Sequence, residues 1–534
     1  MRRRLVLSAG ASALTACLPD SQASRIDGGF VGIHVARGHV LRLPDASAGP
    51  VKTHRTQVLI AGGGVAGLAA ARALRLRGID DFALLELEDQ AGGNSRAGVV
   101  NGLACPLGAH YLPVPSDAAP EVQDLLTELG LGQRSAGRWR LSALGEQQLC
   151  HSPQERLYFR GHWQEGLLPL ADVGPQTLAQ YQRFADAVAQ AQARAVFVIP
   201  VSKHRFRQYH SALDAITFDA WLNETGLTDP YLRWYLDYCC RDDYGAGLNT
   251  VSAWAGIHYF ASRHGFHAPE GELASASPDR DSGVLTWPEG NGWLTRKMAA
   301  AAGPRLQTGY TVTRIEQQRA GVEVDALNAA TGQLERWQAD RCIVAMPLFV
   351  AARVLRQAPQ ALLSAAKAVR YAPWLVANVH IREPLNDRPG APLSWDNVVH
   401  TESGSQQLGY VNATHQALSP APGPTVLTHY RASGTDTAQR QLLYERPWAH
   451  WRDTVLADLQ VPHPDLAAKT TRIDVMRYGH AMAVPVPGFA SHEALAALQA
   501  SAKGQRLHFA HSDLSGYSVF EEAFSQGHRA GMTV

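Results

Sequence analysis

A glycine-rich turn near the start of the chain constrains its fold more than any other feature. The apolar run at residues 58–60 has no polar alternation, which is typical of a parallel strand buried on both faces. Gly62, Gly64 and Gly67 follow at the three positions of G-x-G-x-x-G. These glycines allow a tight turn, close approach of backbone to a pyrophosphate, and close packing of a helix on the strand. The pattern therefore predicts the opening unit of a dinucleotide-binding fold.

The residues after the turn complete that unit. A helix is expected from Val65 to about residue 77, with Ala66 in its first turn, so that its free N–H groups and positive dipole end face an anion. Residues 82–86 are expected to form the second strand. Glu86 ends that strand at the distance where a carboxylate accepts hydrogen bonds from an adenosine ribose.

Other segments resemble the flavin amine oxidase superfamily, which also holds protoporphyrinogen oxidases and carotenoid desaturases. The double glycine at residues 92–96 and the turn at 108–111 are similar to two flavin-contacting segments of that family. Residues 287–294 look like its glycine turn before a helix. Residues 509–513 and 521–527 resemble the strand and helix that close over the flavin pyrophosphate and ribityl chain. The order of these patches is more specific than any one of them.

The resemblance implies FAD as the cofactor. It implies that strands near residues 312, 321 and 341–347 return to the sheet, with Val312 against the adenine. Arg96 would reach the pyrophosphate, although the family usually places arginine where Asn94 stands, and a solvated surface arginine is the alternative. The implied FAD-binding residues are Gly62, Gly64, Val65, Ala66, Gly67, Glu86, Gly93, Arg96, Gly108, Ala109, His110, Val312, Ser512, Asp513 and Glu521.

The chain departs from the family beside the flavin ring. Val376 stands where many family members carry a lysine that is water-bridged to flavin N5. This departure weakens the case for oxygen and strengthens that for a quinone or protein, and the electron acceptor stays open among the three. His480 replaces a flavin-linking cysteine and Ala481 a cage tyrosine, so we expect non-covalent FAD. Tyr517 or Phe520 would face the substrate, but both could equally be core aromatics. His480, Tyr517 and Phe520 are the candidates near the chemistry, and no catalytic residue is assigned.

The first 17 residues have a basic head, a short apolar stretch and a small-residue exit, which is the pattern of a bacterial export signal. Residues 14–17 resemble a lipoprotein signal, in which Cys17 would be acylated, and the arginines before Leu5 resemble a twin-arginine signal. An ordinary secretory signal is the alternative. We expect a periplasmic protein whose membrane contact is a lipid anchor, with residues 18–54 as the tether.

The remaining sequence predicts an α/β protein with an interrupted cofactor domain. The FAD-binding Rossmann-like domain is expected at residues 55–112, 284–350 and 471–534, and an inserted α+β substrate domain at 113–283 and 351–470. The net charge of +1 argues against a nucleic-acid partner.

Two polar clusters leave their roles open. His264, His267, His508 and His511 match no compact zinc spacing, so no metal is predicted. Asp242 and Asp243 lie in an aromatic stretch where they could steer a cationic amine into a cleft, or cap the helix end before Gly245.

The resemblance implies that FAD takes a hydride from a carbon of a small organic substrate, with an amine as the favoured class. A desaturase or isomerase of a hydrophobic substrate is the alternative, and a cleft lined by Leu and Phe without acids would favour it. A non-catalytic flavoprotein is the third possibility, favoured if protein sealed the face of the flavin.

Overall fold

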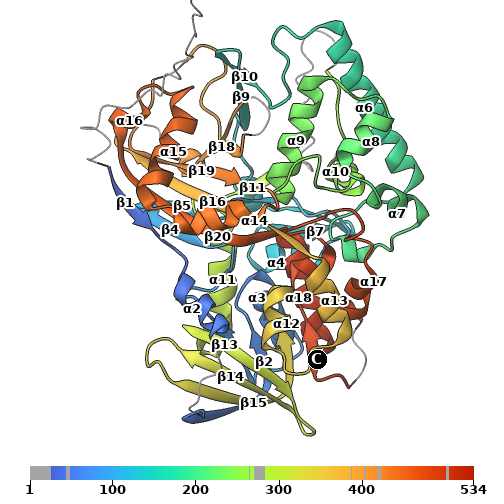
Figure 1. Ribbon diagram of the computed structural model, residues 1–534, viewed down its shortest axis with the longest axis vertical. Coiled ribbons are helices and arrows are strands. Elements are labelled where there is room, and N and C mark those ends of the chain that lie inside the picture. The colour runs from blue at the N-terminus through green and yellow to red at the C-terminus, as the bar shows by residue number, and fades with distance from the viewer. Residues whose placement is uncertain are drawn as a thin grey trace, which may run out of the picture.

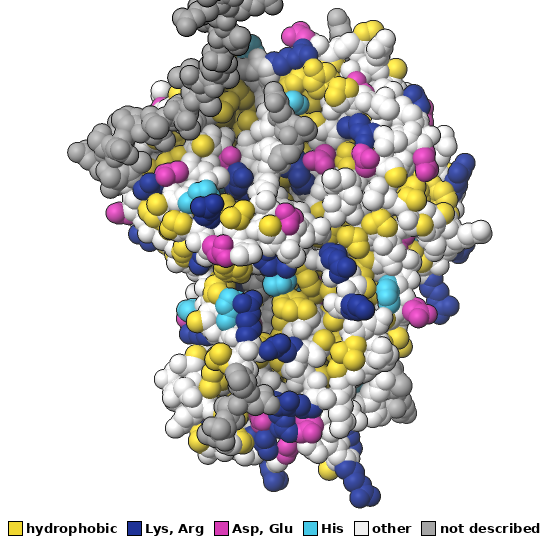
Figure 2. All heavy atoms as spheres, in the orientation of Figure 1, with side chains coloured by type: hydrophobic (Ala, Val, Ile, Leu, Met, Phe, Trp, Pro, Cys, Tyr) yellow, Lys and Arg dark blue, Asp and Glu magenta, His cyan; other side chains and the backbone are white. Residues whose placement is uncertain are grey.

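The computed structural model describes residues 26–43, 49–263, 265–269, 283–386, 388–401, 405–417, 422–500 and 504–534. The expected export signal, including Cys17, lies outside these residues. The described chain has two lobes, with a sheet rich in parallel strands at the bottom of Figure 1 and a second sheet with a helical bundle at the top. On the face shown in Figure 2, basic, acidic and apolar side chains are intermingled.

The lower lobe is the predicted FAD-binding domain, built on a seven-stranded sheet. Its strands are, in order along the sheet, β12 (Leu306–Thr308), β3 (Phe82–Glu86), β2 (Lys52–Ala61), β15 (Leu334–Val344), β14 (Val322–Asn328) and β13 (Tyr310–Gln317), with β21 (Leu507–Phe509) also paired to β15. The pairs among β12, β3, β2, β15 and β21 are parallel, whereas β13 and β14 add an antiparallel edge. The predicted α/β class and the discontinuous Rossmann-like domain are confirmed.

The glycine turn has the predicted geometry. After β2, Gly62 adopts φ +114°, a conformation that side-chain-bearing residues rarely reach. Helix α3 (Val65–Leu76) begins directly after Gly64. A Cβ on Gly67 would lie 1.8 Å from the carbonyl oxygen of Gly62, so only glycine lets the helix pack this close to the turn.

The two ends of the chain meet in this lobe. Strand β21 pairs with β15, and helix α18 (Phe520–Thr533) packs along α3. A Cβ on Gly527 would lie 2.0 Å from the carbonyl oxygen of Ala66, and one on Gly531 would lie 2.6 Å from that of Ala70. The small residues therefore let the last helix lie directly against the first helix of the nucleotide-binding unit.

The upper lobe holds an eight-stranded sheet. Its order is β1 (Asp27–Phe30), β20 (Thr470–Val484), β16 (Arg370–Ile381), β19 (Thr425–Ala432), β18 (Gln407–Asn412), β17 (Asp396–Val399), β9 (Glu155–Phe159) and β10 (His162–Glu165). Strand β20 was expected in the FAD-binding domain, but it pairs with β16 along most of its length. The domain boundary inferred near residue 471 is therefore displaced to the end of β20, because this long strand carries the chain from one lobe to the other.

Part of the expected tether is folded. Strand β1 pairs in parallel with β20, and helix α2 (Val35–His39) follows it. The backbone N–H of His34 donates to the Glu88 carboxylate at 3.1 Å, and Arg37 donates to the Leu87 carbonyl oxygen at 3.0 Å. Residues 26–43 thus join the edge of the upper sheet to the end of β3 in the lower lobe.

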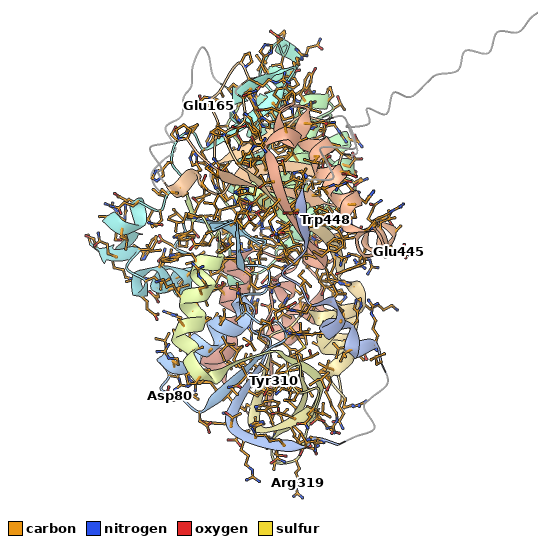
Figure 3. The ribbon with its side chains drawn as sticks, turned by 90° about the vertical axis from the view of Figure 1, so that its left-hand side faces the viewer. Asp80, Glu165, Tyr310, Arg319, Glu445 and Trp448 are labelled. Carbon is orange, nitrogen blue, oxygen red and sulfur yellow. The ribbon has the colours of Figure 1, made fainter. Side chains whose placement is uncertain are left out.

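The first insertion, residues 113–283, contains a bundle of helices. It contains α6 (Pro175–Arg194), α8 (Phe218–Glu224), α9 (Pro230–Tyr244) and α10 (Ala253–Ala261), which lie together at the upper right of Figure 1. Figure 3 shows the two lobes from the side, with Trp448 in the upper lobe and Tyr310 and Arg319 in the lower one. Among the described residues, no helix is both long and apolar enough to cross a membrane.

Candidate active site

Glu86 lies at the end of β3, beside the glycine turn. Its carboxylate accepts hydrogen bonds from the backbone N–H groups of Gly63 and Glu88, both at 2.8 Å, and the residue is only 8% exposed. Burial raises the pKa of Glu86 despite these hydrogen bonds. The glycine turn and an acceptor carboxylate therefore lie together, as a dinucleotide with a ribose hydroxyl requires.

Arg96 is not a surface residue. Its guanidinium is 7% exposed, donates from Nε to the Gly93 carbonyl oxygen at 2.9 Å, and lies 3.8 Å from Glu88. The alternative of a solvated arginine is therefore wrong. Gly93 approaches Gly64, since a Cβ on Gly93 would lie 3.2 Å from the Gly64 Cα. Arg96 thus stabilises the double-glycine segment at residues 92–96 where that segment contacts the glycine turn at residues 62–67.

The closing segment is held by a buried carboxylate. Asp513 accepts hydrogen bonds from the Leu348 backbone N–H at 3.0 Å and from the Tyr371 hydroxyl, and its carboxylate lies 3.1 Å from the His511 ring. Ser512 precedes it and is also buried, while Val312 lies in the apolar core on β13. These contacts fix the segment between β21 and α18 against the sheet.

A pocket of about 150 Å³ lies between the predicted FAD segments and the upper sheet, and is called the inner pocket below. Its walls include the turn at Gly108–His110, the start of α18, and the side chains of Val376 and Ala481. Asn291 is 1% exposed; its amide donates to the Tyr111 carbonyl oxygen at 2.7 Å, but its Oδ1 has no partner among the described residues. This unpartnered acceptor suits the polar edge of a flat heterocycle, and Val376, Ala481 and Phe520 offer apolar surface to its ring. The residues present therefore fit a flavin.

The structure separates the three candidates near the chemistry. Phe520 lines the inner pocket, whereas Tyr517 is 0% exposed and packs against Tyr244 and His258 within the core. The suggestion that Tyr517 faces the substrate is wrong, because the turn before α18 directs it inward. His480 stacks on Phe349 at 4.3 Å between ring centroids and does not line the inner pocket, although its neighbour Ala481 does.

A larger cavity of about 1200 Å³, the outer cavity, adjoins the inner pocket. The two share several wall residues, namely His110, Tyr111, Pro113, Asp242, Arg263, Tyr430 and Glu521. The His110 ring lies 4.7 Å from Tyr430 and 5.3 Å from Trp395, and burial lowers the pKa of His110 to about 3. The junction therefore has a neutral aromatic wall.

Carboxylates face the same junction. Asp243 pairs with Arg263 at 3.0 Å, but Asp242 has no ion pair within the described part of the chain. Glu521 is 4% exposed and its carboxylate has no hydrogen bond or ion pair with another described residue. Burial, together with the neighbouring Asp243, raises the pKa of Asp242 to about 7, and burial raises that of Glu521 to about 7. Asp242 thus points to the cavity rather than serving only as a helix cap.

Sequence reasoning missed the far wall of the outer cavity. Glu155 from β9 and Trp395 and Asp396 from the start of β17 line it, together with Tyr238 from α9. No short motif marks these residues, and only sheet pairing brings them together. The described residues contain no group of three or more His, Cys, Asp or Glu side chains placed to hold a metal ion.

Comparison with known proteins agrees with this geometry. The sequence profile of the family described as "Flavin containing amine oxidoreductase" matches residues 65–534. The chain belongs to this family. The protein is therefore an FAD-dependent oxidoreductase. It is 27% identical over 396 residues to AofH of Mycobacterium tuberculosis, whose name provisionally assigns a flavin-containing monoamine oxidase, and the match spans 70% of this chain and 77% of AofH.

Solved structures show the same fold at low sequence identity. A putrescine oxidase bound to putrescine superimposes with a TM-score of 0.64 at 18% identity, covering 90% of this chain and 98% of the other. Cyclohexylamine oxidase from Brevibacterium oxydans gives 0.61 at 18% identity, covering 89% and 98%. A fatty acid isomerase from P. acnes gives 0.60 at 16% identity, covering 89% and 97%, so the fold alone does not separate the reaction classes.

Proposed function

We propose that this family member oxidises an amine at the carbon bound to nitrogen. The observation that carries the proposal is a pair of carboxylates, those of Asp242 and the buried Glu521, on the walls shared by the inner pocket and the outer cavity. Unpaired carboxylates in a buried cavity attract a cation, and an amine arrives at neutral pH as an ammonium ion.

When bound, FAD accepts a hydride, which is one proton and two electrons, from the substrate carbon. The chain's own residues prepare the substrate for that transfer. The ammonium must first lose a proton, and Asp242 or Glu521 can accept it because their pKa values of about 7 lie near neutrality. Hydride loss from the neutral amine leaves an iminium ion, which then reacts with water to give a carbonyl compound and an ammonium or alkylammonium ion.

The wall chemistry disfavours the alternatives. A desaturase or isomerase of a hydrophobic substrate needs an apolar cleft, whereas six acidic side chains line the outer cavity: Asp117, Glu146, Glu155, Asp242, Asp396 and Glu521. A non-catalytic flavoprotein would need no open cavity beside the flavin site. The cavity therefore supports turnover of a polar, cationic substrate.

Anaerobic titration of the purified holoprotein tests the proposal. Amines should bleach the oxidised flavin absorbance, and the carbonyl product should appear in equal amount. Fatty acids and carotenoids should leave the flavin oxidised. Bleaching by the apolar compounds but by no amine would refute the proposal.

We further propose that a quinone or a redox protein reoxidises the flavin. Val376 lines the inner pocket at the position where the family's resemblance implies a lysine, and it is almost fully buried on β16. The test compares reoxidation of the reduced enzyme by a soluble quinone and by oxygen. Faster reoxidation by oxygen would contradict the proposal.

We also propose that the protein is exported and anchored by a lipid on Cys17, on the basis of the first 17 residues. Palmitate labelling in a bacterial host should mark the wild-type protein, and Cys17→Ala should abolish the label. A labelled Cys17→Ala protein, or an unlabelled wild type that stays in the cytoplasm, would count against the anchor.

A further inference from the structure

Two carboxylates on the far wall of the outer cavity face each other across neighbouring strands. Asp396 and Glu155 are register partners in the parallel pairing of β17 with β9. Side chains at matched positions of adjacent strands point to the same face of the sheet, and here both line the outer cavity. Neither lines the inner pocket, so the pair belongs to the outer cavity alone.

No basic residue of the described chain compensates this pair. Asp396 interacts with the Tyr238 hydroxyl and the Asn397 backbone N–H, and the Glu155 side chain has no hydrogen bond or ion pair with a described residue. Burial, followed by repulsion from Asp242 and Glu155, raises the pKa of Asp396 well above its usual range. Burial likewise raises the pKa of Glu155 to about 7. Like charges opposite each other destabilise a sheet, so this arrangement needs a reason.

The carboxylates continue along the cavity toward the flavin site. Asp242 adds to the electrostatic repulsion at Asp396, and it also lines the inner pocket. Glu521, unpartnered and 4% exposed, lies on the same shared wall. The cavity therefore has a near acidic group at Asp242 and Glu521, and a far acidic group at Glu155 and Asp396, with the ring of Trp395 on the wall beside the far group.

An organic cation suits the far group better than a metal ion. Calcium requires six or more oxygen ligands, and the described residues hold no cluster of three or more metal-ligating side chains. An ammonium group instead needs two or three acceptors and gains from an adjacent aromatic face such as Trp395. Arg138 and Arg140, two exposed residues of β8 (Arg138–Leu141), also line the outer cavity, and within the described chain neither forms an ion pair with Glu155 or Asp396.

We propose that Glu155 and Asp396 bind a second ammonium group of the substrate, so that the enzyme selects diamines or polyamines over monoamines. This inference rests on the proposed amine oxidation. The near group receives the amine to be oxidised, and the far group holds the other end of the molecule in the outer cavity. The preference for diamines over monoamines then comes from two neighbouring strands of the inserted domain, β9 and β17.

The test separates binding from turnover in the holoenzyme. Calorimetry on the holoenzyme with its flavin already reduced, under anaerobic conditions, measures the Kd of butylamine, 1,4-diaminobutane and spermidine without turnover. Absorbance of the oxidised holoenzyme measures flavin reduction by each amine. The wild type should bind one of the two polyvalent amines at least about tenfold more tightly than butylamine, as expected for a close charge pair. The double variant E155Q/D396N should bring that preference to within about threefold, while butylamine binding is unchanged.

A single variant on the neighbouring strand controls for the loss of a carboxylate outside the cavity. Glu165→Gln removes one carboxylate from β10, the neighbouring strand, at an exposed site outside both cavities, which Figure 3 labels at the edge of the upper lobe. It should keep the wild-type preference. Folding of E155Q/D396N is checked by its melting temperature, which should equal or exceed that of the wild type because a repulsive pair is removed.

The outcomes distinguish the two proposals. If no amine reduces the flavin, the proposal of amine oxidation is wrong. The proposed ammonium site at Glu155 and Asp396, called the second-cation site, is still tested separately by the binding preference measured by calorimetry. If the wild type binds mono- and diamines equally, or if E155Q/D396N weakens butylamine as much as the diamine, the second-cation site is overturned. Loss of the preference in Glu165→Gln would also overturn it, because general charge would then explain the effect.

Discussion

The cofactor site and the outer cavity are built by different means. The cofactor site uses backbone: a strand, a turn of glycines and a helix that are continuous in sequence, closed by α18 through Gly527 and Gly531. The outer cavity uses side chains from β9, α9, β17 and α18 that only tertiary structure brings together. The first depends on glycines that larger residues cannot replace, whereas the second can change one side chain at a time and so set specificity.

Replacing a glycine of the turn by a larger residue should have the largest effect on FAD binding. It tests whether the cofactor site depends on close backbone packing. Gly67→Val would place its Cβ within 1.8 Å of the Gly62 carbonyl oxygen, so α3 cannot stay against the turn. We expect soluble protein without flavin, or no folded protein, as measured by the ratio of flavin to protein absorbance. Gly423→Ala, at a site with open space around it, should remain yellow. A yellow Gly67→Val protein would show that the turn is more adaptable than its geometry indicates.

Val376→Lys tests whether one side chain beside the flavin site controls the reaction of the reduced flavin with oxygen. The residue lies on β16 and lines the inner pocket. An ammonium group there should accelerate reoxidation of the reduced flavin by oxygen by about tenfold or more, through electrostatic stabilisation of developing negative charge. Stopped-flow mixing with oxygenated buffer measures the rate. Val376→Met adds length without charge and should stay slow; equal rates for the two variants would mean that size alone matters.

Substitutions in the N-terminal segment, residues 26–43, should have a smaller effect on FAD binding. This segment contacts the cofactor lobe but is not part of the strand–helix–strand unit that binds the nucleotide. The His34 ring lies 2.5 Å from the Glu88 carboxylate, and Arg37 lies 2.7 Å from that of Asp89. The double variant His34→Ala/Arg37→Ala should release FAD several-fold faster, since these contacts hold the loop after Glu86. Flavin fluorescence after dilution measures release. Arg319→Ala, at the lower tip in Figure 3, is the control and should release FAD at the wild-type rate.

The smallest predicted effect concerns pH. The pKa of Glu155 is raised by burial from 4.5 to about 7, so the folded protein holds its proton more tightly than the unfolded chain does. The contribution of Glu155 to the free energy of unfolding therefore falls as pH rises from about 4.5 to about 7, and it is constant above that range.

Buried histidines such as His110 and His258, whose pKa values are lowered to about 3, act in the opposite direction near pH 6, so the comparison must be between variants. The melting temperature of Glu155→Gln minus that of the wild type should increase by about 1–2 °C from pH 5 to pH 8. A constant difference would show that Glu155 titrates normally.

Sequence reasoning predicted the cofactor lobe well because its signals are local. Gly62, Gly67 and Glu86 lie within one strand–helix–strand unit, and their spacing is fixed by that unit. The same reasoning failed where a strand serves both lobes, as β20 does, and where folded structure begins early, as at β1. The choice between Tyr517 and Phe520 stayed open in the sequence, because only the turn before α18 decides which of the two side chains faces the pocket. Glu155 and Asp396 carry no motif, and only the parallel pairing of β9 with β17 makes them neighbours.

The early start of folded structure limits how far the protein can stand from a lipid on Cys17. Only residues 18–25 separate that cysteine from Ile26, the first described residue, and strand β1 begins at Asp27. The nine residue steps from Cys17 to Ile26 span at most about 32 Å even when fully extended. On the proposed anchor, the enzyme body would be confined to the immediate neighbourhood of the bilayer surface, where lipid-soluble quinones are concentrated.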